Sequence, residues 1–170
     1  SSSDIPTPGS WPGVRFYGGT RSDLTSLTHT RIEYGGQGTN GGLNCYSCSP
    51  TFNQCRVVGN AGSGIWSADD AVPTITNCTL DNNSLYPITT HPDHVSVITG
   101  NSGSGNGSGD VIEVRGGAIR TSQTWVPQPL TYRATGDLLV YGPQHDNANP
   151  CVLTLAPGTI VRFNSGCGIY

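Results

Sequence analysis

Two histidines and a carboxylate lie within four residues of each other in the segment HPDH, as His91, Asp93 and His94. Imidazole and carboxylate groups are ligands of divalent metals, and His145 and Asp146 could add further donors. The segment contains a proline and reads as a loop insertion, where three ligands rarely converge without neighbours. We therefore predict that the protein binds no metal and no cofactor. If it does bind a metal, His91, Asp93 and His94 are the candidate ligands.

Six cysteines supply the other reactive groups. Cys45 and Cys48 form a C-x-x-C pair, but zinc would need a second such pair at suitable spacing, and none exists. A redox motif would need a strand that leads into a helix, which this segment lacks. Cys151 and Cys167 are candidates for a bridge near the end of the chain, although the sequence does not fix the pairing.

Paired acids for glycoside chemistry are also missing. Two carboxyl groups would have to lie about 5 to 9.5 Å apart on one face. Asp69 and Asp70 are the one adjacent pair, and adjacent strand residues point to opposite faces. No G-x-S-x-G sequence is present. We therefore expect that the protein is not an enzyme.

The elements that position these groups are short strands. Glycine and proline interrupt nearly every window, and no stretch of a dozen residues has helical apolar spacing. Runs such as GVRFY, TITNCTL, DVIEVRG and GTIVRF are bounded by Gly, Asn, Asp and Pro. The 24 glycines and abundant Ser, Thr and Asn fit an all-β fold with many tight turns.

These strands recur at a fixed interval. Residues 50–60 read PTFNQCRVVGN and residues 73–83 read PTITNCTLDNN, an offset of 23 residues. A second motif, Gly or Pro before a branched apolar residue, includes Ile65 and Ile88 at the same offset. A repeat of 22 to 25 residues without helices predicts a β-solenoid of about seven coils, whose strands pair in parallel with those of the next coil. Leucine-rich repeats need an L-x-x-L-x-L frame, and propeller blades need longer units.

The sequences PTFNQCRVVGNAGSGIW and PTITNCTLDNNSLYPIT resemble coils of right-handed parallel β-helix proteins of the pectate-lyase-like superfamily. The resemblance is to bacterial secreted and surface proteins with rungs of the form PTI-x-N-C-x-I-x-N-N-x-x-x-G-I. It implies that residues 1–170 form a single all-β domain, a right-handed parallel β-helix that one chain winds by itself. The superfamily contains lyases, hydrolases, epimerases, adhesins and inert stalks, so the fold does not imply an activity.

Matching positions of the two copies should stack inside the solenoid. In the strand alternation Cys55 shares a face with Val57, and Cys78 shares one with Leu80. We favour a ladder of thiols over a Cys55–Cys78 disulfide, and either over a metal site. The predicted ladders comprise Cys55 with Cys78, Asn60 with Asn83, Phe52 with Ile75, Val57 with Leu80, and Ile65 with Ile88. The Asn pair is placed at a tight bend, where amides can bond from rung to rung.

The surface carries the remaining functional signals. Asn82 and Asn106 are candidate glycosylation sites at turns, whereas Asn77 lies beside Cys78 and is a poor acceptor. A net charge of −3 and the absence of lysine argue against binding to nucleic acid. No apolar run is long enough to span a bilayer. Low charge and high Thr, Ser and Asn content favour an extracellular location.

The two ends carry the main functional expectation. A solenoid exposes unpaired strands at each end unless capping units cover them. No cap is evident in SSSDIPTPGSWPGVRF or in GCGIY. We expect a structural protein: a protomer or segment of a bacterial extracellular filament, stalk or adhesin that assembles end to end with copies of itself. The alternative is a module that binds or degrades carbohydrate, with surface glycans as partners and Tyr46, Trp66 and Tyr86 as contact residues.

Overall fold

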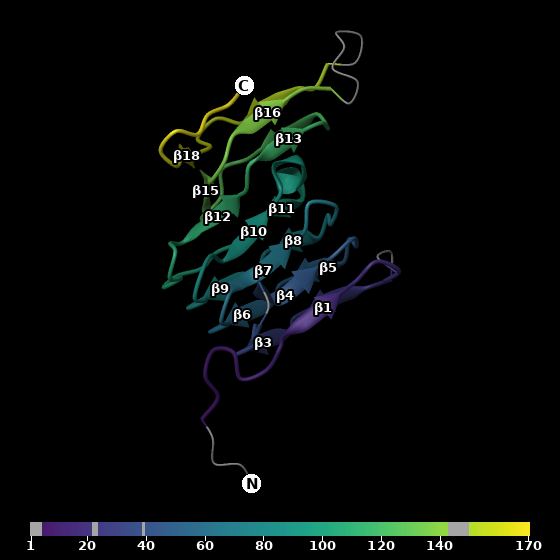
Figure 1. Ribbon diagram of the computed structural model, residues 1–170, viewed down its shortest axis with the longest axis vertical. Helices are drawn as coiled ribbons and strands as arrows, with labels where there is room; N and C mark the ends of the chain where they lie inside the picture. The colour runs from purple at the N-terminus through teal and green to yellow at the C-terminus, as the bar shows by residue number, and fades with distance from the viewer. Residues whose placement is uncertain (1–4, 22–23, 39, 143–149) are drawn as a thin grey trace.

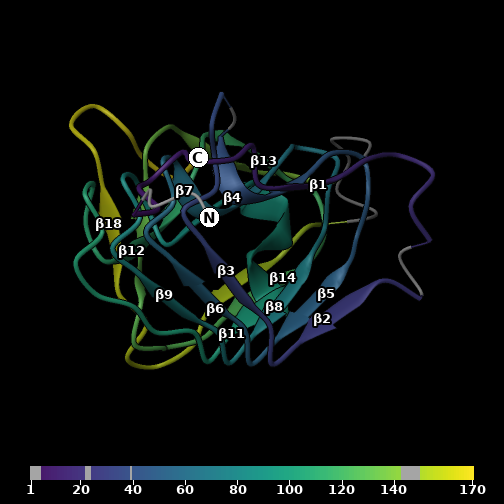
Figure 2. The ribbon, with the colours of Figure 1, turned by 90° about the horizontal axis from the view of Figure 1, so that it is seen from below.

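The computed structural model describes residues 5–21, 24–38, 40–142 and 150–170. Its strands stack in parallel along the long axis of the molecule (Figure 1) and enclose a core when viewed along that axis (Figure 2). The longest sheet has the order β1 (Val14–Phe16), β4 (Gly41–Cys45), β7 (Ser63–Ser67), β10 (Ile88–Thr90), β12 (Val111–Val114), β15 (Thr131–Ala134) and β18 (Val161–Phe163).

Four smaller sheets form the other faces. One has the order β11 (Ile98–Thr99), β8 (Thr74–Thr76), β5 (Thr51–Asn53) and β2 (Ser26–Thr28). Another is made of β3 (Arg31–Glu33), β6 (Arg56–Val58) and β9 (Thr79–Asp81). Two pairs complete the later coils: β13 (Gly117–Ile119) with β16 (Leu138–Val140), and β14 (Gln123–Trp125) with β17 (Leu153–Leu155). A 3₁₀ helix, η1 (Pro92–Val97), occupies the HPDH segment.

This architecture confirms the predicted all-β parallel solenoid. The number of coils differs slightly, because the solenoid makes about five turns rather than seven. Seven strands do stack in the longest sheet, but the other sheets have two to four strands each, so the terminal coils are not complete on every face. No helix among the described residues is long and apolar enough to cross a membrane.

The register follows the repeat read from the sequence. Phe52 pairs with Ile75, Val57 with Leu80, and Ile65 with Ile88. All six side chains point into the core and are at most 1% exposed. Their burial supplies the main stabilising term, at about 1.5–3 kcal/mol for each large apolar side chain before the loss of conformational entropy is counted.

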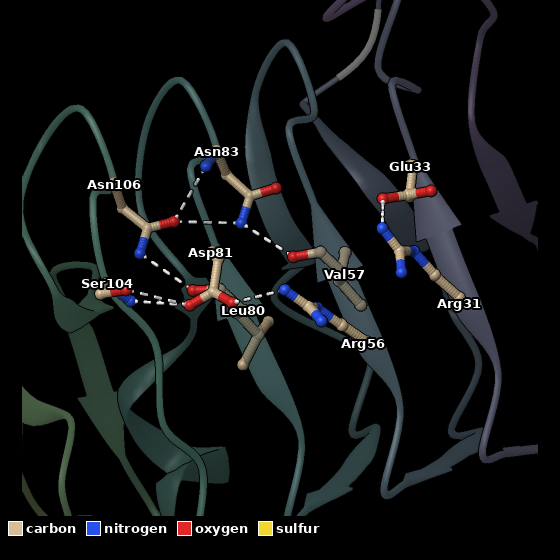
Figure 3. Close-up of polar contacts among 9 residues, drawn as sticks. All are labelled: Arg31, Glu33, Arg56, Val57, Leu80, Asp81, Asn83, Ser104 and Asn106. Atoms are coloured by element: carbon tan, nitrogen blue, oxygen red, sulfur yellow. Dashed lines mark hydrogen bonds and ion pairs between the residues drawn. The ribbon is translucent and has the colours of Figure 1, made fainter.

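The asparagine pair lies inside the solenoid. Asn60 Nδ2 donates to Asn83 Oδ1 at 2.8 Å. Asn83 Nδ2 donates to Asn106 Oδ1 at 3.0 Å, as Figure 3 shows. Asn106 Nδ2 in turn donates to Asp110 Oδ1 at 2.8 Å. The left-handed backbone that turns each corner belongs to the preceding residues, Gly59 at φ 63° and Asn82 at φ 53°, so the predicted Asn positions are one residue past the bend.

A second polar ladder contains the repeated cysteines. Cys55 Sγ donates to Leu27 O at 3.2 Å and Cys78 Sγ to Phe52 O at 3.6 Å. The equivalent residues of the next coils do the same, with Asn101 Nδ2 to Ile75 O at 2.9 Å and Gln128 Nε2 to Ile98 O at 3.0 Å. Each side chain thus satisfies a carbonyl of the coil beneath, a pattern that the sequence comparison missed for Asn101 and Gln128.

All six cysteines have free thiols. The Cys151–Cys167 bridge that the sequence left open is therefore not present. Cys151 precedes β17, whereas Cys167 lies in the turn after β18, so the two residues belong to different faces of the last coil. The Cys55–Cys78 disulfide, the less favoured alternative, is likewise not formed.

Candidate functional site

The strands of the longest sheet all end at one corner of the solenoid, and the residues at or just after these strand ends form the candidate site. Tyr17 and Tyr46 each come directly after a strand, and their rings stack at 5.1 Å with an interplanar angle of 12°. Trp66 of β7 lies 5.3 Å from Tyr46 at an angle of 49°. Tyr17 is 53% exposed, so the row is open to solvent. We call these three residues the aromatic row.

Arg115 closes the aromatic row at the end of β12. Its guanidinium lies 5.2 Å over the Trp66 ring, a cation–π contact. Arg115 Nη2 donates to Ser67 O at 2.6 Å and pairs with Asp69 Oδ1 at 2.8 Å. Because the Asp69 side chain is 71% exposed, this ion pair adds little stability and leaves the carboxylate accessible to a ligand.

A polar cluster lies beside the row, in the turns that follow β4, β7 and β10. Ser47 binds the carboxylate of Asp70 through both its hydroxyl and its amide, the latter at 3.3 Å. The hydroxyl contact holds the pKa of Asp70 below its usual value. The rings of His91 and His94 lie 5.4 Å apart.

Both histidines favour the neutral form. Burial lowers the pKa of His91, and the positive charges that His94 and Arg115 can carry lower it further, while Asp69 and Asp93 oppose the shift. Burial also lowers the pKa of His94, against the opposing effects of Asp93 and Asp69. The histidine pair is therefore neutral at physiological pH.

The three candidate metal ligands do not converge. Asp93 Oδ1 accepts the amides of Arg120 and Thr121, both at 2.8 Å, so its carboxylate faces the next coil. Across the part of the chain that the structure describes, no three His, Cys, Asp or Glu side chains could together hold a metal ion. His145 and Asp146, the further donors, lie outside the described residues.

The structure brings together two of the three aromatic residues expected to contact carbohydrate. Tyr46 and Trp66 are neighbours in the aromatic row, whereas Tyr86 is half-buried and takes no part in it. Tyr17 and Arg115 were missed. Tyr17 follows the apolar residue of its strand by three positions, as Tyr46 does, and this shared position was the signal available in the sequence.

The two candidate glycosylation sites differ in access. Asn82 is exposed at its left-handed corner. Asn106 is only 7% exposed, and its Nδ2 also donates to Leu80 O at 3.0 Å. The expectation for Asn106 is therefore wrong for the folded protein, because the amide nitrogen that would carry the glycan lies within the asparagine ladder. Asn77, which was expected to be a poor acceptor because it lies beside Cys78, is exposed.

A charged strip runs along the outer side of the three-stranded sheet (Figure 3). Arg31 pairs with Glu33 within β3, and Arg56 Nη2 lies 3.6 Å from Asp81 Oδ2 on the neighbouring β9. Asp81 Oδ1 also accepts the amide of Ser104 at 3.0 Å. The two arginines are exposed and each is paired with a partly buried carboxylate, one within a strand and one between coils, so we assign the strip to the solvated surface rather than to a site.

Comparison with known proteins gives one match. A family model described as a right handed beta helix region matches residues 12–124, which is more than half of the chain. No curated protein and no solved structure matches the chain significantly. Strands β15 to β18 lie beyond the matched region and still pair in parallel with the sheets before them.

Proposed function

We propose that this chain, which belongs to the right-handed β-helix family, is a structural segment of an extracellular rod. Copies stack head to tail through their end coils, as in a filament, stalk or adhesin of a bacterial surface. The observation that carries the proposal is a set of apolar side chains on strands β17 and β18 of the last coil that remain half-exposed.

These exposed side chains lie in register with buried ones. Leu155 is 44% exposed, whereas its partner Trp125 in the coil beneath is 0% exposed. Phe163 is 37% exposed above Ala134, which is fully buried. A further coil placed in the same register would remove this apolar surface from water, which is favourable at about 25 cal/mol per Å².

The first coil offers a matching surface. Val14 and Phe16 of β1 stand in the same inward columns that end in Val161 and Phe163 of β18. A copy whose β1 paired in parallel with β18 would continue both columns at the strand spacing of about 4.8 Å. Such a contact joins two different surfaces and does not close on itself, so it builds fibres.

One corner of the first coil is already covered. Trp11 Nε1 donates to Glu33 O at 2.7 Å, and Gln37 N donates to Trp11 O at 3.0 Å. This segment lies over the edge of β3, so it stands in for part of a cap. Stacking would therefore use the edges of β1 and β2.

The test compares the natural chain with two variants of the last coil. Phe163→Asp places a charge on the proposed contact, and Thr154→Asp places one on the outward, exposed side of β17 as the matched control. Light scattering after size-exclusion chromatography and negative-stain microscopy measure assembly. We expect filaments from the natural chain and from Thr154→Asp, and monomers from Phe163→Asp with an unchanged circular dichroism spectrum. Monomers of the natural chain at its highest soluble concentration would refute the proposal.

A second function, glycan binding, is favoured by the stacked rings of the aromatic row. The apolar face of a sugar ring can pack on Tyr or Trp, and Asp69 adds an accessible acceptor. We propose binding without cleavage, because a glycosidase acid needs a raised pKa and that of Asp70 is lowered.

This second proposal is tested on a glycan array, followed by calorimetry with any glycan that binds. Trp66→Ala should weaken binding about fivefold, since one aromatic contact contributes on the order of 1 kcal/mol. Tyr86→Ala, outside the row, is the control and should leave the affinity unchanged. New reducing ends in a polysaccharide digest would contradict the expectation that the protein does not cleave.

A further inference from the structure

We propose that Cys45 and Cys48 are an oxidation site, which closes to an intramolecular disulfide by exchange with a small-molecule disulfide such as oxidised glutathione. The site lies in the turn after β4, under the aromatic row. Oxidation at this site requires neither filament assembly nor glycan binding.

The turn brings the two thiols to the same side. Cys45 ends β4 with its side chain in the core, at 0% exposure, and Cys48 is 5% exposed in the same core cluster. Between them Ser47 adopts the left-handed conformation, at φ 51°, which folds the chain back toward the core. The two thiols lie close enough to influence each other's pKa. A disulfide requires the two sulfur atoms to approach to about 2.05 Å.

The preceding coil and the next coil both hold this turn in place. Tyr46 N donates to Phe16 O at 2.8 Å, and Ser47 binds Asp70 through its amide and its hydroxyl. The thiols are therefore presented in a fixed geometry rather than on a mobile loop. Burial raises the pKa of both Cys45 and Cys48, so exchange is slow at neutral pH and faster at alkaline pH or during folding.

The other neighbouring pair serves as an internal comparison. Cys55 and Cys78 also contact each other, but each thiol donates to a carbonyl of the coil beneath, Leu27 O and Phe52 O. A disulfide there would remove two buried donors, and buried carbonyls left without partners are costly. Oxidation should therefore select Cys45 and Cys48.

The exchange balances in two steps. The Cys48 thiolate attacks one sulfur of the small disulfide, whose S–S bond breaks, and the leaving thiolate takes up the Cys48 proton. Cys45 then attacks the Cys48 sulfur of the mixed disulfide and expels the second thiolate, which takes up the Cys45 proton. The protein loses two electrons and two protons, and the small disulfide becomes two thiols.

The experiment uses the whole 170-residue chain. It is refolded in a glutathione redox buffer, and separately the folded chain is incubated with oxidised glutathione at mildly alkaline pH. Alkylation, digestion and mass spectrometry then locate each thiol and each disulfide. We expect one disulfide between Cys45 and Cys48, with Cys55 and Cys78 alkylated only after unfolding. The oxidised chain should melt higher than the reduced chain, but only by roughly 5 °C, because the disulfide closes a short loop.

Two variants give matched controls. Cys45→Ser should stop at the mixed disulfide on Cys48, which adds the mass of one glutathione, whereas Cys78→Ser should still form the Cys45–Cys48 bond. If a variant fails to fold, the map of the natural chain decides alone. Free Cys45 and Cys48 after oxidative refolding, or a disulfide mapped to Cys55 and Cys78 instead, would overturn the proposal.

Discussion

Replacement of Cys78 by asparagine should keep or raise the stability of the protein, although it puts a polar amide into the core. Cys78 lies in one column with Asn101, and the two side chains have the same partners. Cys78 Sγ donates to Phe52 O and accepts from the amide of Cys55. Asn101 Nδ2 donates to Ile75 O, and Asn101 Oδ1 accepts from the Cys78 amide at 2.9 Å.

The magnitude follows from these contacts. A Cys78→Val variant keeps an apolar side chain of similar size but leaves a carbonyl and an amide of the core without their partner. Each such group costs about 1–3 kcal/mol, so for the two groups we expect the free energy of unfolding to fall by about 2–6 kcal/mol. Cys78→Asn supplies both hydrogen bonds with stronger groups than a thiol, so its free energy of unfolding should lie within about 1 kcal/mol of the natural value or above it.

Urea denaturation followed by circular dichroism gives the free energy of unfolding of the three proteins. A similar dependence on urea concentration would show that the variants unfold from equally compact states. The urea midpoint of Cys78→Asn should equal or exceed that of the natural chain. The midpoint of Cys78→Val should lie well below both. If Asn proves as harmful as Val, or if Val proves harmless, the column is an apolar packing position and the hydrogen-bond interpretation is wrong.

Three further predictions concern the ladder, a close approach and pH. Asn83→Ala removes an acceptor of two bonds from Asn60 and a donor to Val57 O, and should lower the free energy of unfolding by about 2–4 kcal/mol in the same urea assay. Gly64→Ala would place a Cβ 2.7 Å from Pro87 O and should lower the melting temperature by several degrees, on the order of 1–3 kcal/mol. Burial lowers the pKa of His91 and His94, so the unfolded chain binds protons more tightly; stability should fall as pH drops below about 6.5 and go on falling to the lowered pKa values. His94→Asn should flatten that part of the stability profile, and an unchanged slope in this variant would contradict the assignment.

The repeat made much of the fold predictable. Each coil packs almost only on its neighbours, so an offset of 23 residues in the sequence becomes a parallel register in space. The pairs Phe52–Ile75 and Val57–Leu80 could be read in this way because their spacing contains no insertion. Strands β4 and β7 also stack directly, and this stacking brings Tyr46 near Trp66, a contact that the sequence analysis did not predict.

Contacts outside the constant spacing could not be predicted. Arg115 reaches Ser67 across 48 residues, because its long side chain spans the coil between them. Asp93 turns toward Arg120 and Thr121 from an insertion whose length no other coil shares. Asn106 belongs to the asparagine ladder although its surrounding sequence, GNGS, reads as an exposed turn.

The sequence by itself determined the class of fold, the register of the central coils and the inward columns, since these depend on local alternation and a constant repeat. Only the tertiary structure decided which polar groups meet at the corners. It directed Asp93 away from His91 and His94, buried Asn106, aligned Tyr17 with Tyr46, and set Cys45 against Cys48. The physical reason is that turns of unequal length and long side chains carry these contacts, and their geometry is fixed by the packing of whole coils.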